Sequence, residues 1–211
     1  MKSVFILFFK LLNVYKKKRL KILIYEIYFI IKYFKTGNLI KFRNDNTMTD
    51  TIPCPYYFIH KISQFINKEK ISSVIDLGSG YGRITNFLND TTKATIFGYE
   101  LDREVFDISK KNKKINVNIE NKNILNVDYQ NLKVECFILN DPLHRKTDLE
   151  YLIKKIHFSR INLAKKYYLV TINIDKKKYF DKLEIISVSD VFGEAIKRVV
   201  DGTSLSSMFK E

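Results

Sequence analysis

The sequence predicts an α/β fold built on a mostly parallel sheet, and three observations lead to that prediction. Apolar runs of strand length alternate with segments of helical periodicity from residue 71 onward. The run 71–77 enters a loop with glycine at every second position, and a helix-compatible segment follows that loop. The run 134–139 is mostly apolar, which is typical of a strand buried on both faces of a parallel sheet.

The other elements follow in chain order. Apolar residues at helical spacing, directly after two prolines, predict a helix at 57–67. After the glycine loop come a helix at 83–88, a strand at 94–100 and a helix at 102–113, which has acidic residues near its start and lysines near its end. Strands are then predicted at 115–120, 134–139 and 166–174, a helix at 148–161, and two further strands, at 183–188 and between 195 and 209, as the antiparallel end of the sheet.

The glycine loop, Gly78-Ser79-Gly80-Tyr81-Gly82, is the first candidate site. Glycine lets the backbone come close to a ligand, and the helix after the loop offers unpaired N–H groups. A dinucleotide site requires Gly-x-Gly-x-x-Gly, but here the third glycine comes one residue early, and no Gly-Lys-Ser/Thr sequence completes a phosphate-binding loop. Asp76, two residues before the first glycine, would repel a pyrophosphate and attract an ammonium or sulfonium group. The predicted ligand is therefore cationic at this end.

A second carboxylate follows at an informative distance. Glu100 ends the predicted strand 94–100 and lies 18 positions after Gly82. That step is close to the roughly 20 residues after which a βαβ nucleotide site presents the carboxylate that accepts hydrogen bonds from ribose hydroxyls. The pair of Asp76 and Glu100 is much more specific than the glycine loop alone.

The stretch 76–82, with Glu100 after it, resembles motif I and the acidic end of the second strand in class I S-adenosylmethionine-dependent methyltransferases. The resemblance covers about residues 53–211. It implies a Rossmann-like, doubly wound, mostly parallel sheet of seven strands with an antiparallel last strand, and S-adenosylmethionine as the cofactor. Asp-Leu-Gly-Ser-Gly-x-Gly-Arg together with Gly-Tyr-Glu-Leu is also similar to a set of small lysine methyltransferases that carry a hydrophobic N-terminal segment.

The resemblance implies further cofactor contacts, beginning with Ser79 inside the glycine loop. Leu101 would lie against one face of the adenine ring, and plain packing is the alternative. Asn123 stands where the family commonly has an Asp that accepts a hydrogen bond from the adenine amino group, and an amide oxygen can accept the same bond. Tyr56 lies in a segment similar to the one that folds over the cofactor in several small methyltransferases. Cys54 beside it is expected to be a packed residue rather than a nucleophile.

The run Asn140-Asp141-Pro142-Leu143-His144 follows the strand 134–139 and should border the ligand, because ligands lie beyond the carboxyl ends of strands in such sheets. It partly resembles the Asn/Asp-Pro-Pro-aromatic motif of amino-group methyltransferases, but it has one proline and Leu143 replaces the aromatic ring. Without that ring a flipped base loses stacking worth about 1–3 kcal/mol. We expect Asn140 and Asp141 to orient an acceptor nitrogen, and Asp141 or His144 to receive a proton. The alternative is that Asp141-Pro142 only makes a turn.

Cysteines and histidines predict neither a metal site nor a disulfide framework. Cys54 and Cys136 belong to no Cys-x-x-Cys or Cys/His cluster, and His60, His144 and His157 are scattered along the chain. The expected location is cytoplasmic, with peripheral contact at a membrane surface as an addition.

The formal net charge of +14 belongs mainly to the N-terminus, where residues 1–49 hold eleven Lys and Arg against two acidic residues. We therefore divide the chain into a basic amphipathic helical extension, 1–49, and a methyltransferase domain, 50–211. The apolar runs of residues 1–40, about seven residues long, are too short for a bilayer span, which takes roughly 20. The extension is a lid over the domain, a membrane-surface anchor or a nucleic-acid arm.

The leading hypothesis is an S-adenosylmethionine-dependent methyltransferase whose acceptor the sequence does not identify, with a protein side-chain amine as the favoured acceptor. The net charge and Asn140-Asp141-Pro142 motivate a nucleic-acid acceptor as the alternative. The incomplete acceptor motif and the basic extension motivate a third possibility, a non-catalytic membrane-surface or partner-binding module on a methyltransferase fold.

Overall fold

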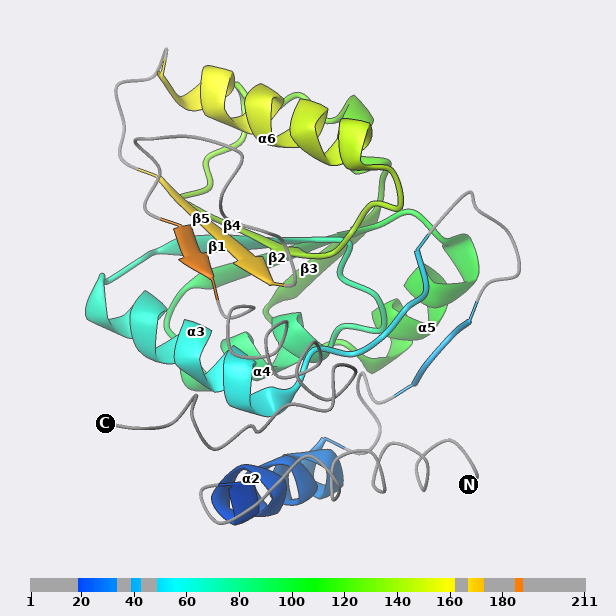
Figure 1. Ribbon diagram of the computed structural model, residues 1–211, viewed down its shortest axis with the longest axis vertical. Coiled ribbons are helices and arrows are strands. Elements are labelled where there is room, and N and C mark those ends of the chain that lie inside the picture. The colour runs from blue at the N-terminus through cyan, green and yellow to red at the C-terminus, as the bar shows by residue number, and fades with distance from the viewer. Residues whose placement is uncertain (1–18, 34–38, 43–48, 162–166, 173–184, 188–211) are drawn as a thin grey trace, which may run out of the picture.

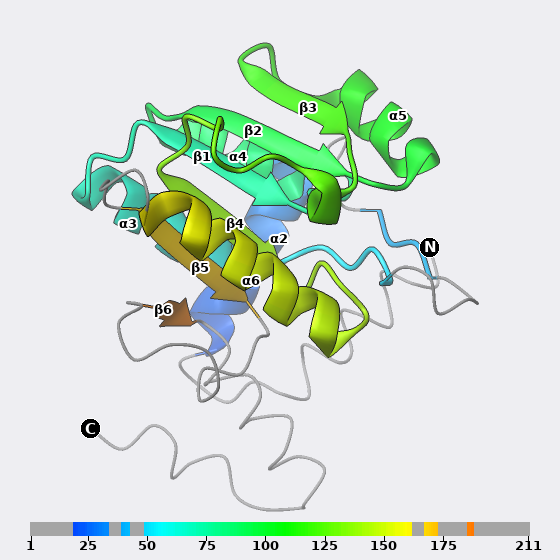
Figure 2. The same cartoon turned by 90° about the horizontal axis from the view of Figure 1, so that it is seen from above.

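A parallel sheet forms the centre of the computed structural model, which describes residues 19–33, 39–42, 49–161, 167–172 and 185–187. The described strands lie in the order β3-β2-β1-β4-β5-β6, and every neighbouring pair is parallel (Figure 2). Their bounds are β1 Ser73–Leu77, β2 Thr95–Glu100, β3 Val117–Asn121, β4 Cys136–Asn140, β5 Tyr168–Ile172 and β6 Ile185–Ser187. The strand order reverses between β1 and β4, which is where such sheets open a crevice for ligands.

Helices cover both faces of this sheet (Figure 1). The helices α3 (Tyr56–Lys68), α4 (Arg83–Thr91) and α5 (Arg103–Asn112) contribute to the hydrophobic cluster on one face. The helix α6 (Lys146–Ile161) packs on the other face, together with the residues around the short 3-10 helix η1 (Ile124–Asn126). The arrangement is the doubly wound, Rossmann-like α/β architecture that the sequence predicts.

Alternating side chains of the central strands divide the core into these two clusters. In β4, Cys136 and Ile138 join the cluster of α3 and α4, whereas Phe137 and Leu139 join the cluster of α6. All four are fully buried, so β4 carries no exposed polar face. This burial explains why the strand reads as an apolar run in the sequence.

The predicted elements from residue 57 to residue 174 are confirmed in type and order, with ends that differ by less than one helical turn. The antiparallel direction predicted for 183–188 is wrong, because β6 runs parallel to β5 with Leu169 opposite Ile185. The connection 173–184 is about as long as the dozen residues that a parallel crossover requires. The strand predicted between 195 and 209, and with it the seventh strand of the sheet, lies outside the described residues.

The described part of the N-terminal extension is mainly the helix α2 (Arg19–Lys32), which packs on the outer side of the α3 and α4 layer (Figure 1). The Glu26 carboxylate accepts a hydrogen bond from the Tyr57 N–H at 2.7 Å, at the start of α3. The Tyr33 hydroxyl donates to Asp90 at 2.9 Å, near the end of α4. Among the described helices, none combines the length and the apolar character that crossing a bilayer requires.

Candidate active site

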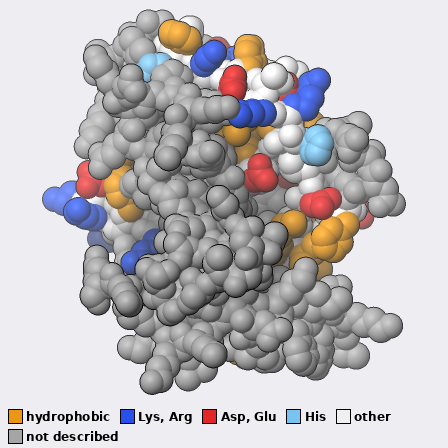
Figure 3. Space-filling model, viewed as in Figure 1, with side chains coloured by type: hydrophobic (Ala, Val, Ile, Leu, Met, Phe, Trp, Pro, Cys, Tyr) orange, Lys and Arg blue, Asp and Glu red, His pale blue; other side chains and the backbone are white. Residues whose placement is uncertain are grey.

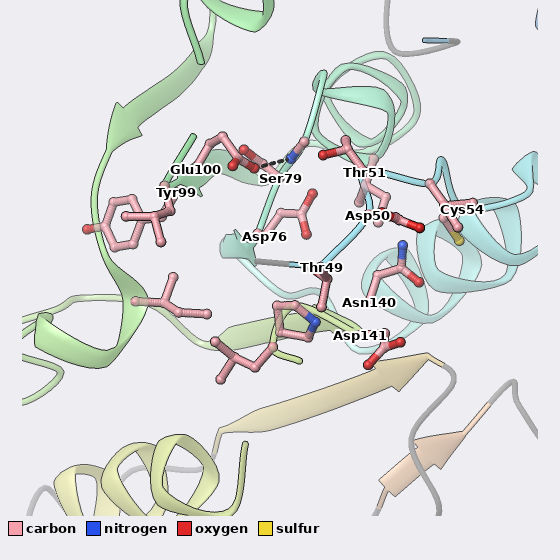
Figure 4. A pocket seen from close by; sticks show the side chains of 18 of the residues that line it. Thr49, Asp50, Thr51, Cys54, Asp76, Ser79, Tyr99, Glu100, Asn140 and Asp141 are labelled. Carbon is pink, nitrogen blue, oxygen red and sulfur yellow. Dashed lines mark hydrogen bonds between the residues drawn. The ribbon is translucent and has the colours of Figure 1, made fainter. Parts of the chain in front are cut away.

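A pocket of about 500 Å³ lies at the carboxyl ends of β1, β2 and β4, where the strand order reverses. Its walls are the glycine loop, the residues that follow β2, the loop after β4 and the segment 49–54 before α3 (Figure 4). Ten of the predicted site residues line it: Asp76, Gly78, Ser79, Gly80, Glu100, Leu101, Asn123, Asn140, Asp141 and His144. Topology therefore brings together residues that are spread over much of the chain.

The glycine loop has a left-handed backbone at each glycine, with φ of 88° at Gly78, 54° at Gly80 and 85° at Gly82. The N–H groups of Gly78 and Ser79 both donate to the Tyr99 carbonyl oxygen at 2.9 Å, and that of Gly82 donates to the Ser79 carbonyl oxygen at 3.0 Å. The Gly80 N–H is bonded to Glu100. These four N–H groups already have hydrogen-bond acceptors within the protein. The loop therefore contributes to a ligand site mainly by letting the ligand come close to its backbone. Gly82 itself is the N-cap of α4 and does not line the pocket.

Gly78 lies directly against the loop that follows β4. A Cβ atom at Gly78 would lie 2.8 Å from the Pro142 Cβ, and its φ of 88° is a conformation that side chains rarely adopt. The contact therefore sets the spacing between the glycine loop and the loop that follows β4.

We expect Gly78→Ala to lower the free energy of unfolding by about 1–3 kcal/mol and to weaken cofactor binding, because the two loops must move apart. Chemical denaturation and calorimetric titration with S-adenosylhomocysteine measure the two effects. Adding Pro142→Gly to that variant removes the opposing Cβ and should restore part of both losses. The absence of any recovery would contradict the contact as their cause.

Asp76, the penultimate residue of β1, directs its carboxylate toward the pocket (Figure 4). The residue is 1% exposed, and neither carboxylate oxygen has a hydrogen-bond partner among the described residues. Burial is the main cause that raises the pKa of Asp76 to about 8, and the nearby charge of Glu100 raises it further. A buried carboxylate without donors is unfavourable unless a ligand supplies them. Asp76 thus fits a ligand that carries an ammonium or sulfonium group.

Glu100, the last residue of β2, shares its carboxylate between two backbone amides. Its Oε2 accepts from the Gly80 N–H at 2.8 Å, and its Oε1 accepts from the Asp102 N–H at 2.9 Å. The side chain therefore ties the glycine loop to the N-cap residue of α5. Each carboxylate oxygen has a second lone pair, so the geometry is compatible with the predicted bonds from ribose hydroxyls.

Leu101 and Asn123 line the pocket near Glu100. Leu101 is 44% exposed and belongs to neither core cluster, so core packing does not account for its position. The Asn123 Oδ1 accepts a hydrogen bond from the Leu125 N–H at 2.9 Å and thereby caps η1. One lone pair of that oxygen and the amide NH₂ group are left for the edge of an adenine ring.

The loop after β4 forms another wall, to which Asn140 and Asp141 contribute (Figure 4). Asp141 has a left-handed φ of 44°, and strained backbone at a site-lining residue is typical of functional positions. Desolvation raises the pKa of Asp141, while the nearby His144 acts in the opposite direction. Pro142 of this loop packs against Gly78, so the loop after β4 and the glycine loop form one continuous part of the wall.

The structure corrects the direct cofactor contact predicted for Tyr56. Its ring has no exposed surface and lies in the aromatic core, outside the pocket lining. The Arg83 guanidinium lies 4.5 Å from the centre of this ring and donates to the Cys54 carbonyl oxygen at 3.1 Å. Tyr56 therefore supports the pocket wall through Arg83.

Cys54 does line the pocket, but burial raises the pKa of its thiol, which keeps it protonated and unreactive. The histidines and Cys136 add no metal site: within the described ranges, His, Cys, Asp and Glu side chains form no group of three or more that is suited to a metal ion.

The sequence analysis gave no role to one wall of the pocket, the segment 49–53. Thr51 pairs with Lys41 in an isolated antiparallel bridge, and the Thr51 Cγ2 lies 3.0 Å from where a Cβ of Gly80 would be. The Lys41 Nζ in turn contacts Asp102 at 2.8 Å and Glu104 at 2.7 Å. The only local signal in the sequence was the pair of prolines at the end of this segment, Pro53 and Pro55. Polar residues without periodicity do not predict a contact.

The chain matches the model of the methyltransferase small domain family over residues 62–196. This range includes all the described strands and two of the pocket carboxylates discussed above, Asp76 and Glu100. A search of curated protein sequences finds no match.

Several solved structures align with part of the chain. An S-adenosylmethionine-dependent methyltransferase of Listeria monocytogenes has 19% identity and a TM-score of 0.41, over 48% of this chain and 45% of that one. An RNA methyltransferase of Salinibacter ruber, in complex with S-adenosylhomocysteine, has 22% identity and a TM-score of 0.38, over 42% and 60%. Magnesium protoporphyrin IX methyltransferase of Synechocystis PCC 6803, with S-adenosylmethionine bound, has 13% identity and a TM-score of 0.40, over 47% and 51%. The chain spans about half the length of these proteins.

S-adenosylmethionine carries an ammonium group, a sulfonium group and a ribose, and the donors and acceptors of the pocket fit that combination. Asp76 lacks the donors that a cationic group would supply, and the Glu100 carboxylate, a strong acceptor, lies beside the glycine loop. The family model extends over more than half of the chain. The chain therefore belongs to the methyltransferase small domain family of class I S-adenosylmethionine-dependent methyltransferases.

Proposed function

We propose that this protein transfers the methyl group of S-adenosylmethionine to an amine, and that the amine belongs to a protein side chain. The observation that carries the proposal is the charge of the pocket. In a chain of net charge +14, the lining of the pocket includes five carboxylates: Asp50, Asp76, Glu100, Asp141 and Asp148. Acidic side chains are also visible on the face between α6 and α5 (Figure 3).

The positive side chains of the lining offset only part of this negative charge. Arg83 is buried and is bonded to the Cys54 carbonyl oxygen, and Arg145 pairs with Asp148 at 2.9 Å. A pocket with such an excess of carboxylates attracts a cationic amine and repels the phosphates of a nucleic acid. The charge pattern therefore favours an amine acceptor over a nucleotide base.

S-adenosylmethionine, when bound, supplies a methyl group on an electrophilic sulfonium sulfur. Asp76 would hold the cationic part of the cofactor, and Glu100 would hold the ribose. The Asn140 side-chain oxygen would accept a hydrogen bond from the acceptor ammonium and orient it. Asp141 would receive one ammonium proton, because attack needs a free nitrogen lone pair. This chain would not need to supply an acid for the leaving group, because the sulfur would keep the electron pair of the S–C bond when the nitrogen takes the methyl group.

Transfer of a radiolabelled methyl group from S-adenosylmethionine to a cell extract tests the proposal. We expect the label in protein, sensitive to protease and recovered after acid hydrolysis as a methylated amine. Asp141→Asn should slow the transfer by about 10²–10⁴-fold, because the proton acceptor is lost, and should leave cofactor affinity intact. Asp107→Asn, at a surface carboxylate of α5 that pairs with Arg103, is the matched control.

Other outcomes of the same experiment decide between the alternatives. Label that nuclease removes would assign a nucleic-acid acceptor, which the basic composition motivates. Cofactor binding without any labelled acceptor would favour the non-catalytic module. The likeness to small lysine methyltransferases stays a prediction, since the family match concerns the broader group.

A further inference from the structure

The outer face of α2 is apolar although it is exposed. Ile24, Ile27, Tyr28 and Ile31 are 58%, 36%, 56% and 70% exposed, and they follow one another at helical spacings of three, one and three residues. These four residues, here called the outer stripe, lie along one side of the helix. A surface helix of a globular protein normally carries polar side chains at such positions.

The opposite side of α2 is already occupied by the rest of the protein. Tyr25, Phe29 and Ile30 pack against the core cluster of α3 and α4, and Tyr33, just after the helix, is buried. The helix is therefore apolar on both sides, and an all-round apolar helix is usually covered on all sides. Within the part of the chain that the structure describes, nothing covers the outer stripe.

The charges that flank the outer stripe in the sequence have one sign. Lys16-Lys17-Lys18-Arg19 and Lys21 precede it in the sequence, and Lys32 and Lys35 follow it. The single carboxylate of α2, Glu26, is buried and bonded to the Tyr57 N–H. An apolar stripe with cations at both ends suits the head-group region of an anionic membrane, where apolar side chains enter the acyl boundary and lysines reach the lipid phosphates.

We propose that α2 docks this protein on the surface of an anionic membrane through the outer stripe. The helix would lie on the bilayer rather than cross it, in keeping with the absence of a membrane-spanning helix among the described residues. A second copy of the chain is a poorer occupant, because pairing two such helices brings their lysines together. A nucleic acid is poorer still, because three of the four stripe residues are isoleucines, which neither stack on bases nor bond to phosphates. This inference does not depend on the identity of the methyl acceptor.

Vesicle co-sedimentation of the full chain tests the proposal. We expect binding to vesicles of phosphatidylcholine mixed with phosphatidylglycerol, no binding to phosphatidylcholine alone, and weaker binding as salt is raised. The double variant Ile24→Asn, Ile31→Asn should reduce the partition at least about tenfold. Ile115→Asn is the matched control, because Ile115 is 94% exposed and is not part of α2 but lies just before β3. All variants should keep the melting temperature and the affinity for S-adenosylhomocysteine of the unmodified protein.

Three results would overturn the proposal. The first is an unmodified protein that does not bind anionic vesicles. The second is a double variant that binds them as well as the Ile115→Asn control. The third is a dimer, seen by light scattering of the unmodified protein and lost in the double variant, since that would assign the outer stripe to a second copy of the chain.

Discussion

Replacing Asp76 with Asn is expected to stabilise the cofactor-free protein and, at the same time, to remove most of its affinity for S-adenosylmethionine. Burial raises the pKa of Asp76 from 3.8 to about 8 in the folded protein. When the pKa of a carboxyl group is higher in the folded than in the unfolded protein, the group stabilises the fold most at a pH below its unfolded pKa. This stability is lost as the pH rises toward its folded pKa. Each pKa unit corresponds to about 1.4 kcal/mol, so the loss approaches roughly 5 kcal/mol at pH 8.

The Asn side chain escapes that loss because it has no proton to release. Thermal melts between about pH 5 and pH 9 should therefore show the Asp76→Asn protein gaining stability over the unmodified protein as the pH rises. The Asp107→Asn control should follow the unmodified protein. Equal pH profiles for all three proteins would contradict the burial of an unpaired carboxylate.

Cofactor binding should show the complementary pH dependence. A cationic ligand binds the ionised form of Asp76, so the affinity for S-adenosylmethionine should rise about tenfold per pH unit up to the pKa near 8. Calorimetric titrations of Asp76→Asn should give weak binding with no such rise. A pH-independent affinity of the unmodified protein would show that Asp76 does not hold the cationic group.

Replacing Glu100 with Gln is expected to lower cofactor affinity by at least about a hundredfold, and also to lower the melting temperature. Both oxygens of Glu100 accept backbone N–H groups, from Gly80 and Asp102. Gln has one oxygen and one NH₂ group, so one backbone donor would then face another donor. Hydrogen bonds to a charged group contribute about 1.5–3 kcal/mol each, and about 3 kcal/mol corresponds to more than a hundredfold in affinity.

The control for Glu100→Gln is Glu120→Gln, which changes a surface carboxylate that pairs with Lys122 at 2.8 Å. Calorimetry with S-adenosylhomocysteine should give unchanged affinity for this control. The melting temperature distinguishes the effects of the two substitutions in the pocket. It should fall for Glu100→Gln and rise for Asp76→Asn. Undiminished binding by the Glu100 variant would remove this residue from the ribose site.

The part of the site that sequence reasoning predicted is the part that local backbone chemistry determines. Gly78 and Gly80 need left-handed backbone, which leaves a recognisable spacing in the sequence. Asp76 and Glu100 lie at the carboxyl ends of their strands, and strand ends can be predicted from apolar runs. The topology then brings these ends to one edge of the sheet.

The parts that were missed depend on contacts between distant segments. Thr51 lies against Gly80, and an isolated antiparallel bridge joins it to Lys41. The sequence around these three residues has no pattern that predicts either contact. Tyr56 was assigned to the cofactor by resemblance, whereas its ring lies against Arg83 in the core. The direction of β6 was equally unreadable, because a short apolar run is the same in a parallel and an antiparallel pair.

The charge of the sequence places a boundary between the basic extension 1–49 and the domain 50–211. The contact between α2 and α3 shows that the packing of the protein does not follow this boundary. The N-cap of α3, Pro55, provides no side-chain hydrogen bond, and Glu26 of α2 supplies an acceptor for the Tyr57 N–H instead. The Phe29 ring of α2 also packs against Tyr56 and Phe87. A shortened form of this protein that keeps its packing must therefore include α2. The basic extension 1–49 thus contributes a helix to the scaffold that holds the pocket wall.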